Sequence, residues 1–149
     1  MRPTPLLLPL ILAISSPPTH ARPQSKPAIP PDSGLIKLRA ACDKEDLLAV
    51  RRLVAPRGVT ISINVFFYNG QPLQEDRARI RPAALKEIRR VCHVFDGDGK
   101  EETTNVCKPE PDSRSVECRI DFTGEHYSLT FVRRAGELLL SSIVGTIDN

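Results

Sequence analysis

The chain has 149 residues and a formal net charge of +3, which allows one ordinary domain and excludes a coiled coil, a collagenous chain and a fully disordered protein. Nine of its 14 prolines lie between Pro3 and Pro31, and every aromatic side chain lies after them. Because each proline restricts φ and removes a backbone donor, a segment of this density does not form a compact fold.

Residues 1–21 have the pattern of a secretory signal. Arg2 supplies a positive charge, residues 6–14 form an apolar run, and residues 19–21 place small side chains at the −3 and −1 positions of a cleavage site. An uncleaved membrane anchor is the alternative, but a helix that crosses a bilayer needs about 20 apolar residues. We expect cleavage after Ala21, export to the periplasm or the extracellular space, and no stable membrane insertion of the mature chain.

Residues 22–32 (RPQSKPAIPPD) contain four prolines and little to bury, which predicts an extended spacer before a single domain over residues 33–149. From Ser33 onward, basic residues exceed acidic ones by only one. The basic cluster of residues 77–90 is diluted by acidic residues and contains no aromatic side chain. It therefore indicates a solvated helix face, with no nucleic acid among the expected partners.

Four cysteines, all after the expected cleavage site, predict two disulfides in an exported chain. Three pairings are possible. We favour Cys92–Cys107 around the turn at residues 96–99, with Cys42–Cys118 tying a helix to the sheet; a local Cys107–Cys118 bridge is an alternative. Metal-binding cysteines normally form close pairs, and the nearest spacing here is eleven residues, so we expect neither a metal site nor a catalytic thiol.

Two helices are expected first. Residues 35–42 follow Ser33 as a candidate N-cap, and residues 44–54 follow Asp43 as a second one. In the second helix Leu47, Val50 and Val54 form the apolar stripe. Residues 56–58 (PRG) then end it.

The next segments alternate between strand and helix patterns. Residues 59–67 have period two and predict a strand with one dry face, followed by an Asn69-Gly70 hairpin turn. Because proline cannot donate to a sheet, Pro72 predicts an edge strand or a loop on the return. Pro82 is expected at the start of a third helix, with an extended segment at residues 91–95.

The last third predicts antiparallel strands. Residues 115–122 alternate, residues 127–131 form the next inward face, and residues 138–147 are apolar on both faces for half their length, as in a central strand. The predicted fold class is therefore α+β: a curved antiparallel sheet with two N-terminal helices and a third helix packed on one face.

This order resembles the nuclear-transport-factor-2-like superfamily, whose fold is a cystatin-like α+β roll. The opening LRAACDKEDLLAVRRLV is similar to the paired helices with which such domains begin, and CRIDFTGEHYSLTFVRRAGELLLSSIVG is similar to their closing strands. The superfamily includes enzymes, ligand carriers and interaction domains, so the resemblance implies a fold and leaves the function open. Its isomerase-like enzymes use a carboxylate base with a tyrosine and a second carboxylic acid, and no residue here matches that set.

Four polar residues interrupt dry faces and are the candidate ligand-binding residues: His93, Tyr127, Arg133 and Ser142. His93 lies between Val91 and Phe95 on a predicted inward face, whereas His126 is expected in an exposed turn. In a concave roll such groups can line an apolar cavity. The acidic turn at residues 96–102 lacks the glycine and glutamate positions of a calcium loop, so we assign no catalytic residue, metal or cofactor.

The predicted function is an exported, disulfide-stabilised domain that binds a partner protein or a small apolar ligand without catalysis. Two alternatives remain. A cavity enzyme of the isomerase or dehydratase type would need His93 or an inward carboxylate with a raised pKa. An inhibitor or immunity-type protein would use an exposed hairpin.

Export itself is testable by mass spectrometry of the intact protein. We expect the exported chain to begin at Arg22 and to carry two disulfides, because both the leader and the cysteine count indicate an oxidising compartment. A chain that begins at Met1, or one with four free thiols, would contradict this.

Overall fold

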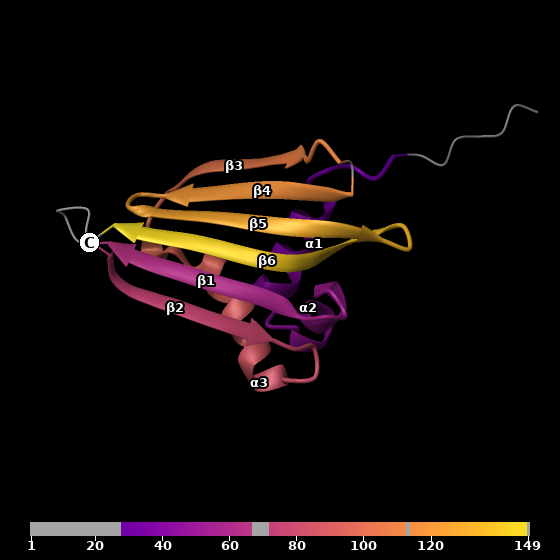
Figure 1. Ribbon diagram of the computed structural model, residues 1–149, viewed down its shortest axis with the longest axis horizontal. Coiled ribbons are helices and arrows are strands. Elements are labelled where there is room, and N and C mark those ends of the chain that lie inside the picture. Colours follow the sequence, from indigo (N-terminus) through magenta and orange to yellow (C-terminus); the bar gives the residue numbers. More distant parts are fainter. Residues whose placement is uncertain (1–27, 67–71, 113, 149) are drawn as a thin grey trace, which may run out of the picture.

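The computed structural model describes residues 28–66, 72–112 and 114–148. Six strands form one sheet in the order β2-β1-β6-β5-β4-β3, and the helices pack on one of its faces (Figure 1). The predicted α+β class is confirmed. The strands are β1 (Val59–Phe66), β2 (Pro72–Ile80), β3 (Glu102–Pro109), β4 (Ser115–Phe122), β5 (Glu125–Arg134) and β6 (Glu137–Asp148).

The two N-terminal helices are α1 (Ser33–Asp43) and α2 (Leu47–Leu53). The second begins later than the sequence predicts, because Glu45 adopts a positive φ of 52° that interrupts the helical path. Asp46, and not Asp43, caps it: its carboxylate accepts a hydrogen bond from the Ala49 backbone N–H at 2.9 Å. Val50 is fully buried, as the apolar stripe predicts.

The third helical segment differs most from the prediction. It consists of a short helix α3 (Leu85–Ile88) that continues as a 3-10 helix, η1 (Arg89–Phe95), followed by η2 (Gly97–Gly99). The extended segment predicted at residues 91–95 is therefore wrong. Ile88, Val91 and Val94 are buried at a spacing of three, which matches the three residues per turn of a 3-10 helix.

The central position predicted for the last strand is confirmed, since β6 pairs with both β1 and β5. One pairing departs from the expected antiparallel sheet: β1 runs parallel to β6, so the sheet is mixed. β2 begins at Pro72 and lies at the edge, where a proline is tolerated. The predicted Asn69-Gly70 turn lies outside the described residues.

The sheet buries one face against the helices. Its inner residues include Ile61, Ile120, Leu129, Phe131 and Ile143, each at most 4% exposed. Arg39 joins α1 to this layer, because its guanidinium lies 2.5 Å from a Glu102 carboxylate oxygen and 5.0 Å from the centre of the Phe95 ring. No helix in the described part of the chain is long and apolar enough to cross a membrane.

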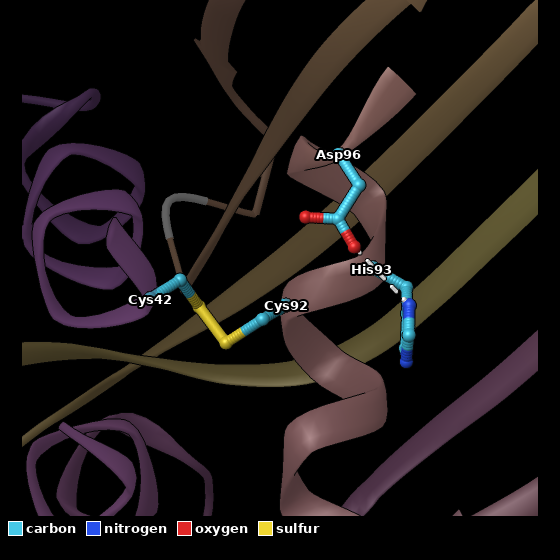
Figure 2. Close-up of a disulfide and its surroundings, with 4 residues drawn as sticks. All are labelled: Cys42, Cys92, His93 and Asp96. Carbon is cyan, nitrogen blue, oxygen red and sulfur yellow. Dashed lines mark ion pairs between the residues drawn. A yellow bond between two sulfur atoms is a disulfide. The ribbon is translucent and has the colours of Figure 1, made fainter. Parts of the chain in front are cut away.

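Two disulfides are present, but the predicted pairing is wrong. Cys42 is bonded to Cys92 (Figure 2). Cys107 is bonded to Cys118. Cys92 lies on η1, which packs beside α1, and not on a strand of a hairpin with Cys107. Cys107 instead lies directly opposite Cys118 in the β3–β4 register.

This connectivity predicts a specific peptide map and a specific loss of stability. Digestion without reduction is expected to yield a peptide containing Cys42 linked to one containing Cys92. Because that bridge spans 50 residues, the Cys42→Ala, Cys92→Ala double variant should lose about 3–4 kcal/mol of unfolding free energy in urea titration. A Cys42–Cys118 peptide, or an unchanged unfolding midpoint, would contradict the assignment.

Candidate functional site

A cavity of about 240 Å³ lies between the inner face of the sheet and η1. Its apolar wall consists of Ile61 and Ile63 from β1, Ile147 from β6 and Val94 from η1. Tyr127 of β5 also lines it and is 7% exposed. The cavity therefore has an apolar wall and one buried aromatic ring that carries a hydroxyl.

Charged groups lie on the solvent side of this cavity. Arg90 of η1 is 2.6 Å from Asp76 of β2, and these side chains are 39% and 52% exposed. His93 also lines the cavity, with its Nδ1 3.2 Å from an Asp96 carboxylate oxygen (Figure 2). The Arg90–Asp76 ion pair joins η1 to the edge strand β2, so polar groups close that side of the cavity.

A glycine makes room for the tyrosine ring. A Cβ on Gly145 would lie 2.5 Å from the Ile63 side chain and 2.8 Å from the Tyr127 ring. Because Gly145 is paired with both Ile63 and Tyr127 in the sheet, its missing side chain lets the two come together over β6. This contact shapes the floor of the cavity.

A buried ionic network lies beside Tyr127. The Tyr127 hydroxyl donates a hydrogen bond to one Glu125 carboxylate oxygen at 2.9 Å. Lys100 Nζ donates a hydrogen bond to the other oxygen at 2.6 Å. Burial acts to raise the pKa of Glu125, but the hydrogen bonds from Lys100 and Tyr127 and the charge of Lys100 outweigh it and lower that pKa. Glu125 is therefore an inward carboxylate held in its ionised form.

A second buried carboxylate lies on the outer face of the sheet. Asp121 is 6% exposed. It accepts a hydrogen bond from Arg119 Nε and lies 3.0 Å from His126 Nδ1. Burial acts to raise the pKa of Asp121, and the bonds from Arg119 and His126 overcome this and lower it. His126, expected as an exposed turn residue, is thus a half-buried partner of Asp121.

The structure brings together two of the four candidate ligand-binding residues, since His93 and Tyr127 line the same cavity. His93 does not face inward as predicted: its side chain is 68% exposed, because the segment is helical and not extended. Arg133 is exposed at the hairpin end of β5. Ser142 lies on the outer face of the sheet, paired with Thr60 of β1 and Thr130 of β5. The β5–β6 register shifts between Thr130 and Phe131, beside this position.

Asp76, Arg90 and Glu125 are functional candidates that sequence reasoning missed. Arg90 belongs to the basic stretch of residues 77–90 that the sequence predicts as a solvated helix face, and Asp76 directly precedes that stretch. The prediction is wrong for residues 77–80, which lie on strand β2, whereas Arg90 lies on the helical segment η1. Glu125 lies outside the inward face that the sequence predicts at residues 127–131. A signal for it exists: it shares the odd-numbered register of Tyr127, Leu129 and Phe131, whose side chains face inward.

Comparisons with known proteins show the fold alone. No family model and no curated protein matches the chain. A solved structure of an uncharacterised cystatin-like protein from Caulobacter vibrioides is similar, with a TM-score of 0.51, 13% identity, and coverage of 79% of this chain and 87% of that one. An NTF2-like protein from Novosphingobium aromaticivorans has a TM-score of 0.43, 11% identity, and coverage of 76% and 77%. The expected resemblance to the cystatin-like fold is confirmed by the first of these.

The buried network predicts a pH-dependent stability. Because the folded-state pKa of Glu125 is lowered, its contribution is present above its unfolded pKa and is lost as the pH falls through the folded value. Lys100→Met removes the main group that lowers this pKa, and should reduce the unfolding free energy at pH 7 by about 1–2 kcal/mol.

Urea titrations at pH 7 and pH 3 check this prediction. The difference between wild type and variant should shrink as the pH falls from 7 to 3, because protonation of Glu125 removes the charge that Lys100 stabilises. Lys108→Met, on an exposed strand position, serves as the control and should change little at either pH. An equal deficit for Lys100→Met at both pH values would contradict the role of the carboxylate.

Proposed function

We propose that this chain is an exported, disulfide-stabilised domain that binds a small, largely apolar ligand in the cavity beside η1, without catalysis. The observation that carries this is the cavity itself, with its isoleucine and valine wall and its polar groups gathered on one side. Ligand sites combine apolar walls with a few placed polar groups in this way.

The size of the cavity limits the ligand. Its volume of about 240 Å³ equals that of roughly eight water molecules at ~30 Å³ each. This favours a molecule of the size of an indole or a short branched acid. The ligand would place its apolar body against Ile63 and Val94 and its polar end towards Arg90 and His93.

The state of the acid–base groups supports a binding role over an isomerase or dehydratase. The enzyme hypothesis requires an inward carboxylate with a raised pKa, whereas Glu125 is inward with a lowered one. A general base near neutral pH needs the opposite shift. His93 is engaged with Asp96 on the exposed side of the cavity.

Export is supported by the cysteines. All four are in disulfides, and the described residues contain no free cysteine. Such bridges persist in the periplasm or outside the cell and are rare in the cytosol.

Methyl-detected NMR with a panel of small probes that includes indole and benzoate tests the cavity. We expect at least one probe to shift the methyl signals of Ile61, Ile63, Val94 and Ile147 together. Ile63→Phe should abolish the shifts, because the larger ring occupies the cavity, and Val144→Phe on the exposed outer face should retain them. Shifts confined to exposed residues such as Ile36 or Val106, or a response that survives Ile63→Phe, would count against the proposal.

A further inference from the structure

An open hollow of about 590 Å³ lies away from the cavity described above and shares no lining residue with it. Four arginines line it, together with two prolines and an alanine: Arg51, Arg57, Arg79 and Arg81. All four arginines are exposed. None of its lining residues is acidic, so the hollow concentrates positive charge.

The fold gathers these arginines from two parts of the chain. Arg51 lies in the last turn of α2, and Arg57 in the connection to β1. Arg79 lies near the end of β2, and Arg81 directly follows that strand. The two connections meet because Val59 pairs with Ile80.

Gly58 permits the close approach of these connections. It adopts a φ of +91°, and a Cβ at this position would lie only 2.5 Å from the Ile80 carbonyl oxygen. A larger residue would force the two backbones apart. The absence of a side chain at residue 58 therefore allows Arg57 and Arg81 to face the same hollow.

The four guanidinium groups have no side-chain partner among residues 28–66, 72–112 and 114–148. Arg39, Arg89, Arg90 and Arg119 are each in an ion pair. In contrast, no side-chain hydrogen bond or ion pair joins any of the four guanidinium groups of the hollow to another described residue. The C-terminus of helix α2, where Arg51 lies, carries only about half a negative charge from the helix dipole. Like charges without a counterion repel one another, so stability does not account for the cluster.

We propose that this hollow binds a compact anion with two phosphoryl groups. Guanidinium forks match the oxygens of phosphate in bidentate geometry. Each phosphoryl group carries roughly −1.5 to −2 charge at pH 7, so two of them balance four arginines. A nucleic acid spreads its charge along a groove or face, whereas these four positive charges surround one hollow. The two phosphoryl groups can belong to free diphosphate or to a lipid headgroup that carries two phosphates.

Calorimetric titration of the disulfide-bonded protein with inorganic pyrophosphate at low salt tests the site. We expect binding that weakens with added salt, as screening requires. Arg57→Gln and Arg79→Gln should each weaken it about tenfold, the loss of roughly one charge-assisted hydrogen bond. Arg134→Gln, an exposed arginine at the β5–β6 hairpin, is the matched control and should remain within twofold of wild type.

Thermal unfolding separates binding from folding. The two site variants should have an unchanged or higher Tm without ligand, because each removes a like charge from the cluster. Vesicles that contain phosphatidylinositol bisphosphate, whose headgroup carries two phosphomonoesters, distinguish the source: a preference for them that Arg57→Gln removes assigns a lipid headgroup, and binding of pyrophosphate alone assigns the free anion. No binding of either probe, or an equal loss with Arg134→Gln, would overturn the proposal.

Discussion

The Cys42–Cys92 disulfide holds the segment on which the candidate cavity depends. It joins α1 to η1, a 3-10 helix of seven residues whose hydrogen-bond geometry is poorer than that of an α-helix. That helix contributes Arg90, His93 and Val94 to the cavity. Its buried Val91 and Val94 pack it on the sheet. The disulfide and these two contacts together set the distance between η1 and the strands, and so the width of the cavity.

The parallel pairing of β1 with β6 determines what faces η1. It places Ile63 beside Gly145, and the antiparallel β5–β6 pairing places Tyr127 on the other side of the same glycine. β1 and the β5–β6 hairpin, two parts of the chain far apart in the sequence, thus form one floor. Lys100 keeps the buried Glu125 in its charged form, and the Tyr127 hydroxyl donates a hydrogen bond to that carboxylate. This hydrogen bond orients the Tyr127 ring.

The distribution of charge is a second consequence of the topology. From Ser33 onward the chain is close to neutral, yet four arginines that form no ion pair with any residue the structure describes meet in one hollow. Two of them, Arg79 and Arg81, lie in the basic stretch of residues 77–90. Acidic residues lie near them in the sequence, but none lines the hollow. Asp76 is engaged with Arg90 in the folded protein. Net charge therefore conceals a local concentration of positive charge created where two loops touch at Gly58.

Local patterns in the sequence determined the elements whose hydrophobic period is clear. The alternation of residues 115–122, the apolar run that became β6 and the stripe that buries Val50 are properties of neighbouring residues, and they predicted the α+β class. They did not decide the disulfide partners, the parallel pairing of β1 with β6, or the 3-10 form of residues 89–95. Those depend on which distant segments pack together: Cys92 meets Cys42 because α1 and η1 cover the same face of the sheet. The cavity and the arginine hollow belong to this second group, since their residues come from segments far apart in the sequence that only long-range contacts bring together.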